Sequence, residues 1–360
     1  MDPMLARLET YKQLIDDDIA GFSDRLLKDW NTRYTSRSGD FMNAYTSLLT
    51  RGGKRLRGSL TMNAYEMLGG DDRQLCTQAA RVIEMVHAYL LILDDIADRS
   101  DTRRGGPSTH RLLEKFHTQN NLTGDPAHFG SSMAMHAAIA GMHLAMVELT
   151  KLPVNDTTKL EALNSLNESL ITTINGQFLD IYNESVRTGI TEEQLIQSAT
   201  WKTAYYSFLN PLEFGAILAG AEQSELAPLK DYSMNMGISF QVTDDILGMF
   251  GDQNAIGKSA QDDLKQGKIT LLISRALERS DSEQKQTLLN ILGNQNLTRD
   301  DYQKAKQIIE DTGALDYARK LAENHAAKAV QALNDVPSHW LKEGLDFLKG
   351  MAEYVVKRSL

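Results

Sequence analysis

Two acidic clusters, 150 residues apart, are the groups in this chain best suited to chemistry. The first contains Asp94, Asp95 and Asp98, and the second contains Asp244 and Asp245. Carboxylate oxygens are the ligands that hard cations such as Mg²⁺ prefer. Basic residues follow both clusters, and their side chains bind anions; they are Arg103, Arg104, Lys258 and Lys268. The combination predicts a diphosphate that is held partly through metal and partly through Arg and Lys.

The first cluster stands at the end of a long predicted helix. Asp94 and Asp98 are four residues apart and so share one face, and His87 lies about two turns earlier. The helix is apolar over residues 82–93 apart from Glu84 and His87. Unpaired buried charge is costly, so a cation is expected beside these carboxylates. The alternative is a solvated helix end, although acids at a helix C-terminus oppose the helix dipole.

The second cluster repeats this arrangement on another apolar helix. Gln241, Asp244 and Asp245 fall at positions i, i+3 and i+4, which places the amide one turn above the two acids. Gln241 taken alone is equally consistent with a hydrogen-bonded core residue. Two acidic pairs, each at the end of an apolar helix, favour the functional interpretation over two coincidental pairs.

Two basic segments are further candidates for anion binding. Residues 51–57 carry four cations around Gly52 and Gly53, whose backbone can approach a ligand closely. Cations at a helix N-terminus oppose its dipole, which favours a bound anion over an ordinary solvated helix start. Lys202 and Thr203 place an ammonium and a hydroxyl at a predicted helix junction, which is uninformative by itself.

Composition limits the class of protein. The formal net charge of −10 makes nonspecific nucleic-acid binding a poor interpretation, because that affinity depends on neutralising phosphates. One cysteine, Cys76, permits no intrachain disulfide, which fits a cytoplasmic protein. The first residues lack the apolar region of a secretory signal, and no stretch approaches 18 uncharged apolar residues, so no membrane span is expected.

Periodicity predicts an all-α protein with a single domain over residues 1–360. Helix formers are plentiful, there are only 7 prolines, and we find no alternating strand pattern of any length. The main helices are expected at residues 3–30, 74–99, 127–150, 157–186, 192–222 and 227–251. Residues 100–108 are expected to form a loop, with Gly105, Gly106 and Pro107 as helix breakers.

These motifs together resemble those of the all-trans short-chain isoprenyl diphosphate synthases, also called polyprenyl synthetases, and in particular the geranylgeranyl diphosphate synthases. They follow the family order between about residues 50 and 275. The matching segments are Gly52–Arg57, His87, Asp94–Asp98, Arg103–Arg104, Gly176–Asp180, Lys202–Thr203, Phe240–Asp245, Gly257–Lys258 and Lys268–Thr270. The resemblance implies the isoprenoid synthase fold, a helical bundle around a deep central cavity, and a homodimer.

The resemblance also implies an activity: transfer of an allylic prenyl group (dimethylallyl, geranyl or farnesyl) to isopentenyl diphosphate, with three Mg²⁺ ions. Asp94 and Asp98 would bind two ions, and Asp244, supported by Asp245, would bind the third. The residues implied to contact the allylic diphosphate are Arg103, Lys202, Lys258 and Lys268. Those implied to bind isopentenyl diphosphate are Lys54, Arg57, His87 and Arg104. Those implied to face or line the cavity of the allylic carbocation are Thr203, Gln241, Gln177 and Asp180.

Two details of the resemblance concern this chain in particular. Many relatives carry a third aspartate in the second motif, where this chain has Gly248, and Asp252 cannot be assigned in its place. Tyr89 lies five residues before Asp94, about 7.5 Å deeper along the helix, where a ring would block a growing chain. With Leu90 beside it, this pattern implies a twenty-carbon product, geranylgeranyl diphosphate. Alternatively, Tyr89 is only a core aromatic.

Other functions remain open from sequence. Farnesyl diphosphate is the alternative product. A class I terpene cyclase shares the ionisation chemistry but does not need a separate set of cations for isopentenyl diphosphate. An accessory subunit of a heteromeric prenyltransferase would be expected to lose its acidic motifs, and here both are present. An acidic interaction protein without chemistry would leave the ordered motifs unexplained.

Overall fold

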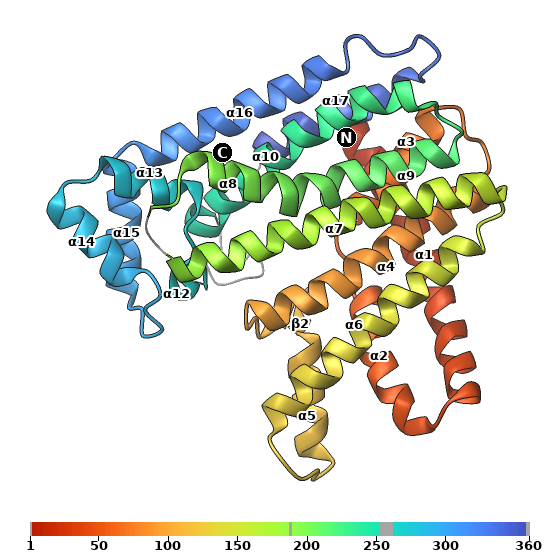
Figure 1. The fold of residues 1–360 in the computed structure, drawn as a ribbon, viewed down its shortest axis with the longest axis horizontal. Coiled ribbons are helices and arrows are strands. Elements are labelled where there is room, and N and C mark those ends of the chain that lie inside the picture. Colours follow the sequence, from red (N-terminus) through yellow and green to blue (C-terminus); the bar gives the residue numbers. More distant parts are fainter. Residues whose placement is uncertain (1, 187–188, 252–261, 358–360) are drawn as a thin grey trace. The chain divides into compact units, whose positions relative to one another are not determined.

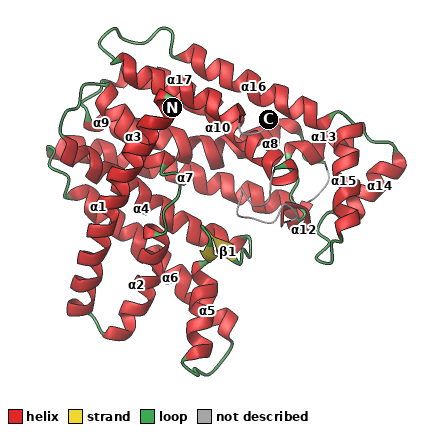
Figure 2. Ribbon diagram, turned by 180° about the vertical axis from the view of Figure 1, so that it is seen from behind, coloured by secondary structure: helices red, strands yellow, loops and turns green. Residues whose placement is uncertain are grey.

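The computed structural model describes residues 2–186, 189–251 and 262–357. Its regular structure is helical except for one short antiparallel hairpin, drawn yellow in Figure 2. The prediction of an all-α protein is therefore confirmed. The chain divides into two compact units, here called unit 1 (residues 1–164 and 214–221) and unit 2 (residues 165–213 and 222–360). The prediction of one domain over residues 1–360 stays a prediction.

Unit 1 contains the first acidic cluster and the glycine-rich basic segment. Figure 1 colours its first part from red to yellow. Its elements are α1 (Pro3–Arg33), α2 (Ser36–Thr50), α3 (Leu56–Met67), α4 (Arg73–Ala97), β1 (Thr102–Arg103), β2 (Gly106–Pro107), α5 (Thr109–Gln119) and α6 (Pro126–Thr150). Helix α4 packs against α3 and α6, and α5 packs along α6.

Unit 2 contains the second acidic cluster. The helices α7 (Asp156–Val186) and α9 (Asn210–Leu218) each run from one unit into the other. The remaining elements are α8 (Glu192–Ala199), the π-helix η1 (Thr200–Leu209), the 3₁₀ turn η2 (Gln223–Glu225), α10 (Leu226–Phe250), α12 (Asp262–Gln266), α13 (Leu271–Arg279), α14 (Ser282–Ile291), α15 (Arg299–Asp311), α16 (Ala314–Ala332) and α17 (Lys342–Lys357). Helix α10 packs along α16 and against η1.

Local signals explain where the helices begin. Asp2 caps α1 by accepting a hydrogen bond from the Met4 backbone N–H, and Asp72 caps α4 in the same way. The predicted helices agree with α1, α4, α6, α7 and α10 to within three residues at each end. The segment predicted as one helix over 192–222 is instead three successive elements, because its middle turns are π-helical.

The hairpin is a second difference from the prediction, which placed a loop at residues 100–108. Thr102 pairs with Pro107, and Arg103 pairs with Gly106. The two turn residues, Arg104 and Gly105, have φ angles of 53° and 70°. Both angles are positive, as a tight two-residue hairpin turn requires. The strands are too short for an alternating pattern to reveal them.

Helices α4 and α6 are long and apolar enough, by length and composition, to cross a membrane. The prediction from sequence overlooked both. In α4, 72% of the most apolar window is buried inside the protein, whereas in α6 the share is 33%. Core helices of soluble proteins meet the same criteria, so two such helices carry little weight, and the absence of a membrane span stays a prediction.

Candidate active site

The C-terminal end of α4 carries its three carboxylates on two faces. Asp95 is fully buried and accepts a hydrogen bond from Arg103 Nε at 2.7 Å. Asp94 and Asp98 are half-buried, and Arg103 also reaches Asp94, at 3.3 Å. The β1–β2 hairpin turns the chain back onto α4, and this turn makes the contact possible. Burial opposes the charge of Arg103, but the bond and the charge of Asp95 outweigh it and raise the pKa of Arg103.

A buried network of ion pairs around Arg55 fixes the glycine-rich segment that precedes α3. Arg55 has a left-handed backbone conformation, with φ of 48°, and its side chain is fully buried. Its guanidinium donates to Asp16 on α1 at 2.7 Å, to Glu84 on α4 at 3.0 Å and to the Leu49 carbonyl at 2.7 Å. Glu84 also accepts from the Gly58 backbone N–H. Arg55 therefore anchors the segment, while its neighbour Lys54 is exposed.

Arg57 on α3 and His87 on α4 lie side by side. Their Nη1 and Nε2 atoms are 3.3 Å apart. Burial, followed by the charges of Arg57, Arg104, Arg103 and Arg55, holds the pKa of His87 well below its usual value. The imidazole is therefore neutral at pH 7, and its Nε2 can accept the hydrogen bond that Arg57 donates.

Arg104 lies against the same glycine-rich segment. It donates to the Leu48 carbonyl at 3.2 Å, and its guanidinium is 3.3 Å from the point where a Cβ on Gly53 would be. A side chain at position 53 would press on Arg104, and φ of 124° there is also suited to glycine. The structure thus brings Lys54, Arg57, His87 and Arg104 to one part of unit 1.

Tyr89 on α4 has a neighbouring buried tyrosine on α2 that sequence reasoning did not single out. Tyr45 on α2 is fully buried, and its hydroxyl donates to the Met85 carbonyl, one turn from Tyr89. Burial, and then the charge of Tyr89, raise the pKa of Tyr45, so the two side chains are close enough to interact. A Cβ on Gly141 of α6 would lie 2.2 Å from the Tyr45 ring. Glycine at 141 therefore makes room for this tyrosine, while Leu90 is half-buried beside Tyr89.

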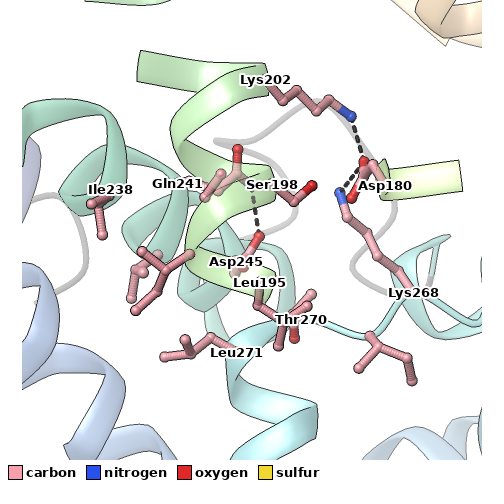
Figure 3. A pocket seen from close by; sticks show the side chains of 14 residues that line it. Asp180, Leu195, Ser198, Lys202, Ile238, Gln241, Asp245, Lys268, Thr270 and Leu271 are labelled. Atoms are coloured by element: carbon pink, nitrogen blue, oxygen red, sulfur yellow. Dashed lines mark hydrogen bonds and ion pairs between the residues drawn. The ribbon is translucent and has the colours of Figure 1, made fainter. Parts of the chain in front are cut away.

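In unit 2, one carboxylate holds two lysines at the edge of a pocket (Figure 3). Asp180 on α7 pairs with Lys202 Nζ at 2.5 Å and lies 3.8 Å from Lys268 Nζ. Burial alone would raise the pKa of Asp180, but the two ammonium groups outweigh burial and lower it to about 2. Asp180 is therefore ionised at any physiological pH.

A second chain of contacts runs from η1 to α10, and two of its members, Gln241 and Asp245, line the same pocket. Thr203 donates to Gln241 Oε1 at 2.6 Å, and Gln241 Nε2 donates to Asp245 Oδ1 at 2.9 Å. Burial, only partly offset by Lys268 and reinforced by Asp263, raises the pKa of Asp245 to about 7. The Gln241 amide is thus fixed in orientation by a donor on one side and an acceptor on the other.

The π-helix η1 is what places Lys202 and Thr203 beside these partners. A Cβ on Gly176 of α7 would lie 2.2 Å from the Lys202 backbone N, and one on Gly237 of α10 would lie 2.2 Å from the Ala204 Cα. Because Gly176 and Gly237 have no side chains, α7 and α10 can each pack closely against the backbone of η1. Short π-helical turns are frequent at functional sites.

The other predicted residues have less defined positions. Gln177 and Asp244 are both half-buried, on α7 and α10, and neither lines the pocket of Figure 3. Lys258 and Asp252 lie outside the described residues. Within residues 2–186, 189–251 and 262–357, no group of three His, Cys, Asp or Glu side chains could by itself hold a metal ion.

Sequence reasoning missed several partners. It noted Glu84 only as an exception in an apolar stretch, and it did not recognise that Arg55 is the partner of both Glu84 and Asp16. It also passed over Asp263, whose charge acts on Asp245. Glu84 carried a usable signal, since a carboxylate inside an apolar helix needs a cation. The partners themselves follow only from tertiary structure.

The helical fold with its carboxylates, cations and fixed amide fits a class of enzyme that handles diphosphates. Comparison with known proteins identifies the family: residues 40–309 match the polyprenyl synthetase model. This match covers more than half of the chain, which therefore belongs to the polyprenyl synthetase family, has the isoprenoid synthase fold and is a prenyltransferase.

Individual relatives cover nearly the whole chain. A geranylgeranyl diphosphate synthase from Saccharolobus solfataricus is 30% identical over 95% of this chain and 98% of its own length. A geranylfarnesyl diphosphate synthase from Aeropyrum pernix is 30% identical over 86% and 92%. The structure is similar, with a TM-score of 0.91, 29% identity and coverage of 98% and 99%, to geranylgeranyl pyrophosphate synthase from Corynebacterium glutamicum complexed with isoprenyl diphosphate and magnesium.

Proposed function

We propose that this protein condenses isopentenyl diphosphate with allylic diphosphates and releases geranylgeranyl diphosphate. The observation that carries the proposal is the set of three cations and one neutral imidazole around the anchored glycine-rich segment of unit 1, namely Lys54, Arg57, Arg104 and His87. A cyclase that uses one diphosphate does not need this set in addition to the cations near the acidic clusters. Relatives named geranylgeranyl diphosphate synthase support the product.

The proposed cofactor is Mg²⁺, with three ions present when diphosphate is bound. Asp94 and Asp98 would hold two, and Asp244, with Asp245, would hold the third. The donors fit this ion, because Mg²⁺ is usually bound by one or two carboxylates plus substrate phosphates rather than by a complete protein cage. When bound, the metal neutralises the leaving diphosphate as a Lewis acid.

The chain's own cations would share that task. Arg103, Lys202, Lys268 and Lys258 would contact the allylic diphosphate. Lys202 and Lys268 are already held at Asp180, so they are oriented before substrate arrives. Preorganised charges of this kind stabilise charge as it separates, without the cost of moving at the moment of reaction.

The fixed amide of Gln241 would face the carbon chain as it ionises, together with Thr203, and Gln177 would line the same cavity. An amide oxygen and a hydroxyl oxygen lower the energy of a nearby carbocation but attack it slowly. The apolar lining, including Leu195, Ile238 and Leu271, keeps water from the cation. We assign the final proton to the released diphosphate.

Two tyrosines would end chain growth at twenty carbons. Tyr89 blocks the path along α4, and Tyr45 supports it from α2 in the space that Gly141 leaves. Farnesyl diphosphate is the alternative product, if the chain is stopped nearer to the acidic cluster than Tyr89.

Neutral His87 can still donate a hydrogen bond to diphosphate, since its Nδ1 carries the proton when Nε2 accepts from Arg57.

The test is a product assay with Mg²⁺, labelled isopentenyl diphosphate and, separately, dimethylallyl, geranyl and farnesyl diphosphates. We expect a twenty-carbon alcohol after dephosphorylation from all three primers. Tyr89→Ala should lengthen the product, while Tyr89→Phe, which keeps the ring, should not. A fifteen-carbon product from the unaltered protein would overturn the product assignment, and absence of elongation would favour the cyclase or accessory-subunit alternatives.

We also propose that the enzyme is a cytoplasmic homodimer that pairs along α7. Five apolar side chains on this helix are exposed at helical spacing, with 44–62% of their surface accessible; they are Ile171, Ile174, Phe178, Ile181 and Tyr182. Stripes of this kind mark interaction surfaces, and a two-fold axis makes one stripe complementary to its copy. Sedimentation should give a dimer, which Phe178→Glu should dissociate and Leu341→Glu, an exposed apolar position elsewhere, should not.

A further inference from the structure

The two acidic motifs differ at one equivalent position. On α4, Asp94 is followed four residues later by Asp98, so two carboxylates share a face about 6 Å apart along the helix. On α10, Asp244 is followed four residues later by Gly248, which has no side chain. If the second motif needs a pair of carboxylates as the first does, the second member must come from elsewhere in the chain.

The structure contains a carboxylate at that place. A Cβ built on Gly248 would lie 2.9 Å from Asp263 Oδ2 and 3.9 Å from Asp263 Cγ. The carboxylate of Asp263 therefore occupies the space that a side chain at position 248 would enter. Asp263 belongs to α12, a different element, and is half-buried.

Backbone contacts hold Asp263 in this position. Its carbonyl accepts a hydrogen bond from the Lys268 backbone N–H at 2.9 Å. The next residue, Leu264, is 1% exposed in the core of unit 2, and its carbonyl accepts from the Gly293 N–H at 2.7 Å. The segment that carries the carboxylate is thus held by its own turn and by the backbone of Gly293, so the approach to α10 is a property of the fold.

The electrostatic surroundings favour a cation beside this carboxylate. Asp263 acts on Asp245 as a like charge, and Asp180 does so as well, while Lys268 is the cation that opposes them. Lys268 is also 3.8 Å from Asp180 and therefore shared. Several acids around one shared lysine form a group that a divalent cation would stabilise.

We propose that Asp263 supplies the carboxylate that α10 lacks at position 248, and that it binds, with Asp244, the Mg²⁺ of the second motif. This inference rests on the proposed metal-dependent function. Asp244, supported by Asp245, provides an oxygen ligand from α10, and Asp263 adds one from α12. The pair reproduces the i, i+4 arrangement of Asp94 and Asp98 with one member moved to another element.

The experiment exchanges the carboxylate between the two positions. Asp263→Ala removes it, Gly248→Asp crowds a second one against it, and the double variant Gly248→Asp with Asp263→Ala returns one carboxylate to α10. Binding of Mn²⁺ in the presence of inorganic diphosphate is measured on the full-length protein by titration calorimetry and by electron paramagnetic resonance, which counts bound ions. Asp316→Asn, an exposed acid of the same unit, is the control.

We expect Asp263→Ala to lose one bound Mn²⁺ per chain or to weaken its binding about tenfold or more. Gly248→Asp alone should also weaken it, because the new side chain collides with Asp263. The double variant should recover the number of ions and come within about threefold of the unaltered affinity. Asp316→Asn should change nothing.

The proposal is overturned if Asp263→Ala binds Mn²⁺ as the unaltered protein does, or if the double variant binds no better than Asp263→Ala. Thermal melting without metal identifies variants that are merely unfolded, and Asp263→Asn, which keeps the shape, replaces Asp263→Ala in that case. Asp244→Ala separates the two levels of inference. If it loses an ion while Asp263→Ala does not, only this proposal fails; if neither loses an ion, the proposed metal role of the second motif fails with it.

Discussion

The ends of α4 and α10 carry the same pair of adjacent aspartates, but the fold treats the second member of each pair differently. Asp95 is buried against the guanidinium of Arg103, which is supplied by the hairpin after α4. Asp245 is buried against the neutral amide of Gln241, and its pKa is raised to about 7. Asp95 has an arginine as its direct hydrogen-bond partner, whereas Asp245 shares one lysine with further acids.

This difference teaches that a sequence motif specifies which oxygens are available but not their charge. Charge depends on the partner, and the partner comes from another element. At α4 the partner is an Arg eight residues later, which a short hairpin can deliver. At α10 the partner lies one turn back on the same helix and carries no charge. The contact of Asp95 with Arg103 therefore stabilises unit 1, whereas the burial of ionised Asp245 lowers the free energy of unfolding.

The largest expected effect is the loss of unfolding free energy when the Asp95–Arg103 ion pair is broken. Asp95→Asn leaves the mostly buried guanidinium of Arg103 without its main counter-charge, and such a loss typically costs about 3–5 kcal/mol. Urea unfolding of the metal-free protein should measure it. The control is Asp101→Asn, which removes a surface partner of Arg111 and should cost about 0–1 kcal/mol. Equal losses in the two variants would show that burial does not distinguish the two ion pairs.

A smaller, pH-dependent effect is expected at the second pair. The pKa of Asp245 is about 7 in the folded protein against 3.8 normally, so the folded state binds the proton more tightly. Asp245 therefore costs stability progressively as pH rises from about 4 to 7, and the full cost remains above pH 7. Asp245→Asn should consequently gain stability over the unaltered metal-free protein, with a gain that is small at pH 5 and largest at pH 8.

Asp180→Asn is the control for this pH dependence. The pKa of Asp180 is lowered to about 2, so its contribution is complete above about pH 4 and is lost only as pH falls toward 2. Asp180 also acts weakly on Asp245, so the stability difference between Asp180→Asn and the unaltered protein should change only slightly from pH 5 to pH 8. An equally slight change for Asp245→Asn would contradict the comparison between the two aspartate pairs.

The smallest expected effect concerns the amide beside Asp245. Thr203→Val removes the donor to Gln241 Oε1 and should cost about 1 kcal/mol of unfolding free energy. Turnover should fall more than the affinity for either substrate, because Gln241 loses its fixed orientation. Thr287→Val, which removes a hydrogen bond within α14, provides a matched change outside the pocket. If both variants turn over equally, Thr203 has no positioning role.

The sequence predicted the helical class and the long helices because their apolar spacing is local information. It also brought forward the residues that the structure groups as Arg57 with His87 and as Thr203 with Gln241. Their roles in catalysis stay predictions. The π-helix was not predictable, since ten residues of η1 have the same apolar spacing as an α-helix to within the accuracy of that signal.

Long-range partners were the other omission. Arg55 meets Asp16 and Glu84 across separations of 39 and 29 residues, so no window along the sequence contains the network. The same holds for Asp263 beside Gly248, which lie on two helices joined by a segment outside the described residues. In each case the residue types were visible, but their proximity depends on how helices pack.

The π-helical form of η1 has a consequence for changes in chain length. Its hydrogen bonds join residues i and i+5, so each hydrogen-bonded ring contains one more residue than in an α-helix. Deleting a single residue after Thr203 would let the backbone close into ordinary α-helical turns, with little change in helical content. The deletion would nevertheless turn the preceding side chains relative to α9, so the Lys202 and Thr203 contacts and the helix that follows could not both keep their places. An ordinary surface loop tolerates such a deletion, whereas this helix makes the count of residues between Thr200 and Leu209 part of the site.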